Sequence, residues 1–276
     1  VDSTVTKWKP GDRVTVPFSM GCGVCDLCNV GDLQICDDYY QPGFTGWGSF
    51  AEYVALPFAD TNLVRLPGSI EFEAAASLGC RFITSFRAIT AQSSLREGQY
   101  LAVHGCGGVG LSAIMIGRTL DAEIIAVDVS DDALTLAKDC GANHVVNAKT
   151  VDVVDAVQSI TKGGAHVSID ALGSTETVRN SIACLRKRGR HVQIGLMTGE
   201  HSEPPIPFGQ IIAKEIEIVG SHGMSAHEYP RLMTMLENGS LNISQLVTQT
   251  IPLEAVPDAL PAMGVKSPVG ITIVKP

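Results

Sequence analysis

The middle of the chain alternates between short runs that are apolar throughout and longer segments with a helical period. The first two runs are residues 100–105 (YLAVHG) and 123–129 (EIIAVDV). Similar runs follow at 144–148, 166–172, 191–195 and 215–221, and helices are predicted at 111–120, 133–140, near 151–161 and near 175–186. Continuously apolar strands that alternate with helices indicate a parallel sheet covered on both faces. This region therefore predicts a doubly wound α/β domain.

The pattern on either side of this region is different. Up to about residue 80 the chain is rich in Gly and Pro and has short β-type runs, at 13–18, 50–56 and 62–67. A helical period then extends from Phe72 to about Leu95. After a helix near 228–238, strands are predicted at 245–253 and 270–275, with a short helix near 255–263. We expect the tail to return to the first domain, which gives a β-rich domain of residues 1–86 and 222–276 and an α/β domain of residues 87–221.

Composition excludes several classes of function. The 276 residues are 45% hydrophobic and carry a formal charge of −9, which is typical of a globular protein of one or two domains. An acidic balance without a Lys/Arg stripe argues against nucleic acid as a partner. No apolar stretch is long enough to span a membrane. Cysteine is sparse outside one cluster, which favours a reducing cytoplasm.

That cluster is CGVCDLCNVGDLQIC, residues 22–36, which contains four of the eight cysteines. Cys22, Cys25, Cys28 and Cys36 have the spacing C-x2-C-x2-C-x7-C. Four thiolates can surround one tetrahedral zinc and leave no open position, so such an ion would stabilise a loop rather than catalyse a reaction. Chance C-x-x-C pairs or a redox dithiol are the alternatives, but four thiols exceed what a redox pair needs.

The strand at 100–105 leads directly into GCGGVG and then a helix. Gly105 suits a tight turn, Gly107 lets the backbone approach a pyrophosphate, and Gly110 lets helix and strand pack closely. The next strand ends in Asp128, whose carboxylate can accept hydrogen bonds from the ribose hydroxyls of NAD and repels the extra phosphate of NADP. We therefore expect NAD(H) on a Rossmann domain; a flavin- or nucleoside-binding domain is the alternative.

The order of these motifs carries a family resemblance. A four-cysteine loop precedes EAAASLGC (73–80), then AVHGCGGVG and AVD. The chain resembles the zinc-dependent medium-chain alcohol dehydrogenases essentially from end to end. The resemblance implies a GroES-like β-rich catalytic domain beside the Rossmann domain. It also implies reversible oxidation of a primary or secondary alcohol to an aldehyde or ketone, through an alkoxide bound to a second zinc.

The resemblance also implies roles for individual residues. Cys80 corresponds to one ligand of the catalytic zinc, although a lone cysteine is more often a buried apolar thiol. Phe18 and Trp47 fall where the family lines its substrate pocket, with core aromatics as the alternative. We assign the remaining cofactor contacts to Thr84, Gly108, Val109 and Ile194. His104, which precedes the glycine turn, is interpreted as structural.

The sequence departs from the family pattern at both ends. The family's early cysteine, its Gly-His-Glu motif and its proton relay have no counterpart among these residues, so we expect a chain that is truncated at the N-terminus, incomplete in its β-rich domain and inactive. Near the C-terminus, Gly270 stands where many relatives have an arginine that contacts the pyrophosphate, with Lys266 nearby.

Two other functions stay open. One is a polyol or formaldehyde-type dehydrogenase of the same superfamily; the other is a non-catalytic NAD-binding module held together by zinc. A zinc-free quinone reductase is disfavoured by the four clustered cysteines. We expect a small alcohol or aldehyde as substrate and a homo-oligomer, either dimer or tetramer, with 215–221 as a candidate edge strand.

Overall fold

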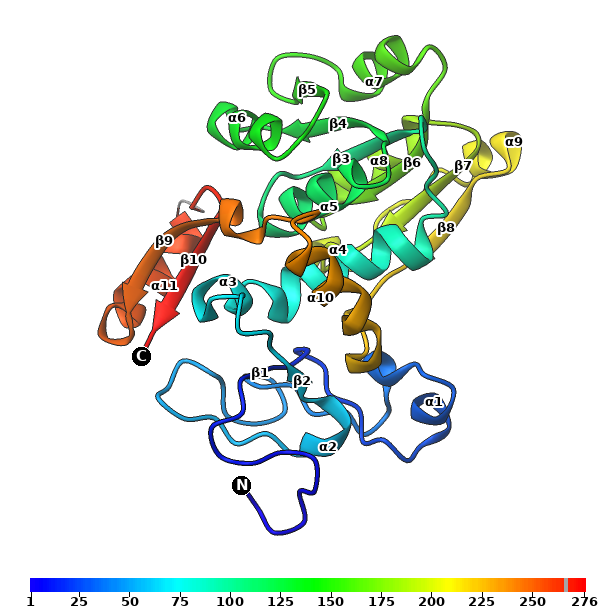
Figure 1. The fold of residues 1–276 in the computed structure, drawn as a ribbon. Helices are drawn as coiled ribbons and strands as arrows, with labels where there is room; N and C mark the ends of the chain where they lie inside the picture. Colours follow the sequence, from blue (N-terminus) through cyan, green and yellow to red (C-terminus); the bar gives the residue numbers. More distant parts are fainter. Residues whose placement is uncertain (266–267) are drawn as a thin grey trace. The chain divides into compact units, whose positions relative to one another are not determined.

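The computed structural model describes residues 1–265 and 268–276 and contains two compact units. Unit 1 comprises residues 1–83 and 222–276, and unit 2 comprises residues 84–221. Figure 1 colours the chain by sequence, so that unit 2 runs from cyan to yellow and the two parts of unit 1 lie at the blue and red ends. The first junction therefore lies three residues before the expected position at 86/87.

Unit 2 is built on a parallel six-stranded sheet with the strand order β5-β4-β3-β6-β7-β8. Every strand predicted in this region is present, although β7 begins six residues earlier than expected. Neighbouring strands are in register, for example Leu101 opposite Val167 in β3 and β6. The strands are β3 Tyr100–His104, β4 Glu123–Asp128, β5 His144–Asn147, β6 Ala165–Asp170, β7 Leu185–Gln193 and β8 Glu217–Gly220.

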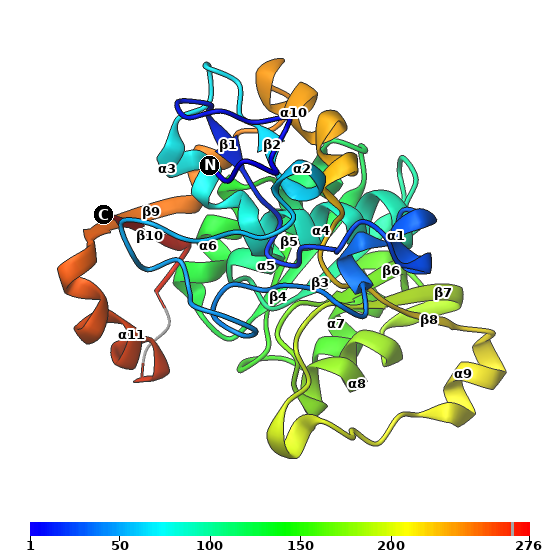
Figure 2. The same ribbon diagram turned by 90° about the horizontal axis from the view of Figure 1, so that it is seen from below.

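Helices connect these strands and cover the sheet. The helices α5 and α6 pack together, as do α7 and α8 (Figure 2). The chain builds outward from β3 in one direction and then from β6 in the other, so right-handed crossovers place the two pairs on opposite faces. The confirmed fold class is α/β. The helices are α4 Ile83–Arg87, α5 Gly108–Arg118, α6 Asp131–Asp139, α7 Val153–Thr161, α8 Thr175–Ala183 and the unpredicted α9 Phe208–Lys214, with short turns η3 Ala88–Gln92 and η4 Gly199–His201.

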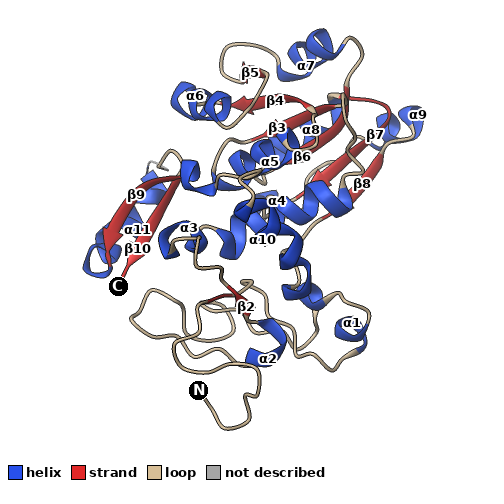
Figure 3. Cartoon of the chain, in the orientation of Figure 1, coloured by secondary structure: helices blue, strands red, loops and turns tan. Residues whose placement is uncertain are grey.

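Unit 1 is dominated by loops (Figure 3). Its strands form two small sheets: β1 Val14–Thr15 pairs antiparallel with β2 Val64–Arg65, and β9 Val247–Pro252 pairs parallel with β10 Ile271–Lys275. Its helices are α1 Asp26–Asn29, α2 Ala59–Asn62, α3 Phe72–Ala76, α10 Tyr229–Glu237 and α11 Val256–Val265, with short turns η1 Leu33–Ile35, η2 Leu78–Phe82, η5 Ala226–Glu228, η6 Ile243–Leu246 and η7 Leu253–Ala255.

One expectation for this part of the chain is wrong. The run 50–56 is not a strand, because its backbone has no ladder partner among the described residues, and Tyr53 is 89% exposed. The helical period that begins at Phe72 is confirmed as helix, although not as regular α-helix throughout. It contains two π-helical stretches, η2 and η3, which a hydrophobic period of 3.6 cannot reveal.

A buried polar contact joins the two sequence segments of unit 1. The Ser225 hydroxyl is fully buried and lies 2.9 Å from the Gly31 carbonyl oxygen and 2.5 Å from Gln34 Oε1. Buried polar atoms need such partners to offset lost hydration. The contact therefore holds the loop at 31–34 against the C-terminal segment.

Candidate functional site

The four clustered cysteines converge on one point. Their sulfur atoms all lie within 4.8 Å of one another. Cys22 Sγ is 4.0 Å from Cys28 Sγ, and Cys25 Sγ is 3.7 Å from Cys36 Sγ. Zinc–sulfur bonds of about 2.3 Å place the corners of a tetrahedron about 3.8 Å apart. The thiol positions therefore fit a single zinc ion with a complete shell of sulfur ligands.

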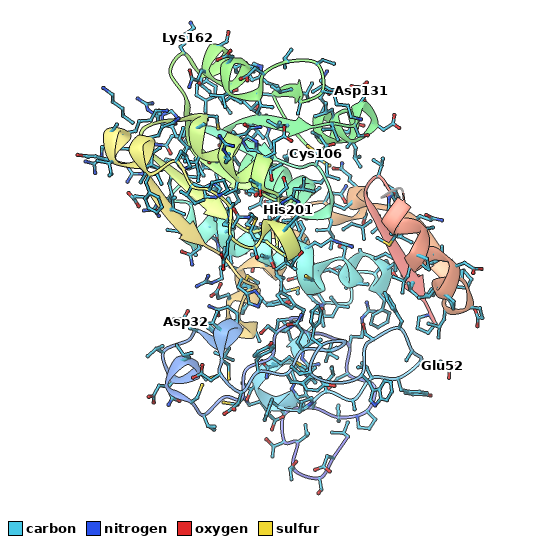
Figure 4. All side chains as sticks on the ribbon, turned by 180° about the vertical axis from the view of Figure 1, so that it is seen from behind. Asp32, Glu52, Cys106, Asp131, Lys162 and His201 are labelled. Carbon is cyan, nitrogen blue, oxygen red and sulfur yellow. The ribbon has the colours of Figure 1, made fainter. Side chains whose placement is uncertain are left out.

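Local backbone geometry shapes this loop, which Asp32 marks in Figure 4. Gly23 and Gly31 have φ angles of +82° and +99°, where side chains are disfavoured. The buried Asn62 amide holds the start of the loop, because its Nδ2 donates to the Gly21 carbonyl at 2.8 Å and its Oδ1 accepts from the Gly21 N–H at 3.0 Å.

The electrostatic environment differs among the thiols. Hydrogen bonds from backbone N–H groups, first that of Val24, lower the pKa of Cys22 to about 7. Burial raises the pKa of Cys28 to about 12 and also raises that of Cys36. Zinc binds thiolates, so filling this site requires proton release from the buried cysteines.

Each of three glycines in the turn after β3 suits its position for a different structural reason. Gly105 has a φ angle of +93°. A Cβ on Gly110 would lie 1.8 Å from the Gly105 carbonyl oxygen, so no side chain fits there. A Cβ on Gly107 would meet nothing in the chain within 4 Å. That open space lies at the N-terminus of α5, where free N–H groups attract phosphate.

Asp128 ends β4 beside this turn. Its Oδ2 accepts from the Cys106 N–H at 2.6 Å, and its Oδ1 accepts from Val129 and Ser130 N–H groups at 2.7 and 2.9 Å. A carboxylate has about four acceptor positions, so at least one remains for a ribose hydroxyl. Figure 4 labels Cys106 in the turn and Asp131 at the start of α6. The turn and the acid are therefore in contact, and NAD binding by them stays a prediction.

Two further loops reach the same edge of the sheet, and of their residues only Ile194 was expected from the sequence to contact the cofactor. The buried Asp170 carboxylate accepts from the Leu172 and Gly173 N–H groups, both at 2.9 Å. A Cβ on Gly195 would lie 2.3 Å from the Gly173 nitrogen, so the loops after β6 and β7 are in close contact. Leu196, which follows Gly195 in the second of these loops, is 69% exposed. Glycines directly after apolar strands were the sequence signal that could have pointed to these loops.

Val109 and Gly108 lie in the first turn of α5, as expected for pyrophosphate contacts. Ile194 lies directly after β7 and is buried, with its N–H donating to the Asp170 carbonyl at 3.1 Å. Thr84 is buried in α4. Contacts of these four residues with a cofactor stay predictions.

Cys80 lies in η2 of unit 1 and is exposed. Surrounding protein groups raise the pKa of its thiol by desolvation, and Arg81 opposes this. The Gly79 carbonyl accepts from the Phe18 N–H at 2.8 Å, and the Phe18 ring meets His222 edge-on at 5.2 Å. Phe18 therefore lies next to the Cys80 segment, and its role in a substrate pocket stays a prediction.

The structure adds Tyr229 to this region. Its side chain is fully buried, and its hydroxyl has no hydrogen-bond partner in the described part of the chain. Burial raises its pKa above the ordinary value, and Cys80 raises it further. A buried hydroxyl beside the proposed ligand is a polar feature that no sequence motif indicated.

Other predicted residues are less well placed. Trp47 is 93% exposed, so it is not a core aromatic. Gly270 has a φ angle of +78°, and a Cβ there would lie 2.4 Å from Thr248 Cγ2, so this backbone excludes an arginine. Lys266 lies outside the described residues. Across residues 1–265 and 268–276, the four-cysteine cluster is the only group of three or more potential metal ligands, so Cys80 does not complete a second one.

Known protein families match both units. Residues 1–68 match the alcohol dehydrogenase GroES-like domain, and residues 108–238 match the zinc-binding dehydrogenase domain. An NAD-dependent alcohol dehydrogenase from Sulfurisphaera tokodaii is 33% identical over 264 residues, covering 94% of this chain and 74% of the relative. The chain belongs to the zinc-dependent medium-chain alcohol dehydrogenases.

Other members of this alcohol dehydrogenase family are similarly related. A sorbitol dehydrogenase from Halalkalibacterium halodurans is 31% identical over 88% of this chain and 71% of its own length. The alcohol dehydrogenase structure from Aeropyrum pernix superimposes with a TM-score of 0.89 at 28% identity, covering 100% of this chain and 79% of that one. In the described residues, no helix combines the length and apolar character needed to cross a membrane.

Proposed function

We propose that this protein oxidises a primary or secondary alcohol to an aldehyde or ketone with NAD as the hydride acceptor, and catalyses the reverse reaction. The observation that carries the proposal is the pairing of the Gly105–Gly110 turn with the Asp128 carboxylate. The similarity to named alcohol dehydrogenases supports the same reaction.

Each part of the dinucleotide site has a distinct task. The N–H groups at the start of α5 hold the pyrophosphate, and Gly107 leaves the space for it. Asp128 accepts a hydrogen bond from the adenosine ribose and repels a 2′-phosphate. The loops at Gly173 and Gly195 present an apolar surface at the same edge of the sheet. Bound NAD supplies the hydride chemistry, and these residues orient it.

The two proposed zinc roles differ. The four-cysteine loop fits a zinc that stabilises unit 1. A catalytic zinc, when bound, polarises the alcohol oxygen as a Lewis acid. We assign Cys80 as one ligand of this catalytic zinc. We assign Phe18 and Trp47 to the substrate pocket. An apolar Phe18 side chain favours an apolar alcohol, whereas the sorbitol dehydrogenase relative supports a polyol.

Two measurements test the proposal: NADH binding, detected by fluorescence, and NAD reduction by the zinc-loaded protein. Simple alcohols and polyols serve as substrates. We expect NADH binding by residues 1–276. We expect little alcohol-dependent NADH formation from these residues alone, because Cys80 belongs to no group of three potential metal ligands in the described part of the chain. Rapid NADH formation would contradict the expected inactivity, and absence of NADH binding would refute the dinucleotide site.

We further propose a homo-oligomer in a reducing compartment. The eight cysteines all lie in the described part of the chain and form no disulfide among themselves there. The strand β8 is one edge of the unit 2 sheet, and Ile218 on it is 45% exposed. Pairing of this edge with a second copy would cover unpaired backbone groups. Light scattering during size-exclusion chromatography measures the assembly, and a monomer at micromolar concentration would contradict it.

A further inference from the structure

A cavity of about 380 Å³ lies within unit 2, at the sheet edge where the strands begin. We call it the cation pocket, after the basic side chains that line it: Arg96, His166, Arg186, Lys187, Arg188 and Arg190. They come from the segment before β3, from the start of β6 and from β7. This set was not selected from the sequence, because its members are scattered between residues 96 and 190.

The cation pocket is separate from the dinucleotide site. Phosphate-binding turns in parallel sheets lie at the carboxyl ends of the strands, and the glycine turn follows the end of β3. The pocket lies at the amino ends, where β6 begins at Ala165. In Figure 4, Cys106 marks the carboxyl edge, and Lys162, three residues before β6, marks the amino edge.

The cation pocket has more positive side chains than acidic side chains to neutralise them. Glu217 is the one acid among the lining residues, and it pairs with Arg190. Arg188 meets Glu215 at 3.3 Å, but both side chains are more than 70% exposed, so this ion pair is weak. The side chains of Arg96 and Lys187 have no ion pair in the described part of the chain. An uncompensated basic pocket on a chain of net charge −9 points to an anionic ligand.

His166 lies against one of these arginines. Its Nδ1 accepts from the Tyr100 N–H at 3.1 Å, and its Nε2 lies 2.6 Å from Arg186 Nη1. No ligand atom fits between two groups at that separation, so an anion would reach Arg186 through the other N–H groups of its guanidinium fork.

The backbone of the cation pocket is strained at two non-glycine positions. Arg188 has a φ angle of +59°, and Ser94, which also lines the cavity, has +54°. Glycine adopts this conformation at low steric cost, whereas a side chain costs about 1 kcal/mol. An arginine at such a position places a cation where the fold alone would favour glycine.

We propose that the cation pocket binds a phosphate group, either as the free ion or as the monoester of a small molecule. Phosphate offers several acceptor oxygens to cations that approach from different directions, and arginine forks match that geometry. The cavity volume falls in the range of about 300–1,000 Å³ that is usual for small-molecule sites. This site goes beyond the proposed dehydrogenase function and does not depend on it.

Calorimetric titration of the full chain tests the proposal. Inorganic phosphate and phenyl phosphate are titrated separately at constant ionic strength, in the presence of saturating NADH so that the glycine turn is occupied. The variants are Arg186→Gln and, as a matched control, Arg179→Gln on α8, which is exposed and outside the cavity. Thermal unfolding confirms that both variants are folded.

We expect one saturable site per chain, with affinity reduced about tenfold by Arg186→Gln and unchanged by Arg179→Gln. Binding of both probes identifies a small phosphorylated molecule as the ligand, and binding of phosphate alone identifies the free ion. The proposal is overturned if neither probe saturates at about 10 mM, or if both variants weaken binding equally.

Discussion

At the scale of single residues, we propose that Asp128 determines which dinucleotide binds. We predict that Asp128→Asn weakens NADH binding about tenfold and strengthens NADPH binding, because a charged acceptor and its repulsion of the 2′-phosphate are both removed. Fluorescence titration with each cofactor measures the change. The exposed Asp132→Asn on α6 is the control, and an unchanged preference in Asp128→Asn would show that discrimination lies elsewhere.

Two glycines of the same turn separate binding from folding. Gly107→Ala places a methyl group in open space, so we predict a folded protein with unchanged unfolding temperature and at least tenfold weaker NADH binding. Gly110→Ala places that group against the Gly105 carbonyl, and overpacking should cost about 1–3 kcal/mol or more. Calorimetry and NADH titration of both variants measure this. Equal effects on stability would contradict the assigned roles.

At the scale of elements, the loop of residues 21–36 depends on its metal. We predict that this loop binds one zinc ion tightly. Cys28→Ser should lose that zinc and much of the stability of unit 1, because an incomplete ligand shell leaves three thiols converging without an ion. Elemental analysis and thermal unfolding give the readouts. Cys140→Ser, on a buried thiol outside the cluster, should keep its zinc.

The unit 2 sheet contains a buried histidine with a consequence for acid stability. His104 ends β3, its Nε2 lies 3.6 Å from Cys184 Sγ, and burial lowers its pKa to about 4, opposed by Asp170. The unfolded chain, with a histidine pKa near 6.5, binds this proton first, so folding becomes less favourable as pH falls from about 6.5 to 4.

We therefore predict that His104→Leu reduces the loss of unfolding free energy between pH 8 and pH 5 by about 2 kcal/mol. Denaturant titrations at both pH values measure the difference. The exposed His144→Leu on β5 is the control and should retain the wild-type pH dependence. Identical pH profiles for wild type and His104→Leu would show that His104 carries no proton-linked stability.

These elements also show what could be read from the sequence. The strands of unit 2 and the glycine turn are local patterns, so they were predicted within a few residues, except for the early start of β7. The run 50–56 has the composition of a strand, but pairing depends on distant partners that composition does not specify. The π-helical stretches around Cys80 and Ala88 and the cation pocket around Arg186 likewise arise from tertiary packing, which no single window contains.

At the scale of the whole molecule, the GroES-like unit is assembled from two sequence segments, and the Rossmann unit is one continuous insertion. The family assignment draws on both ends of this arrangement, since residues 1–68 match the GroES-like domain and residues 108–238 match the zinc-binding dehydrogenase domain. We propose that zinc stabilises the first unit and that NAD binds the second, so that each cofactor can be removed and its effect on stability measured separately.

The contact between Ser225 and Gly31 has a consequence for synthesis on the ribosome. The two residues are 194 positions apart. At about 5–20 residues per second, Ser225 is made roughly 10–40 s after Gly31. During that interval Gln34 Oε1 lacks the Ser225 hydroxyl that donates to it in the folded protein, and all of residues 84–221 is translated. The nascent chain therefore has time to complete its inserted domain before its first domain can close.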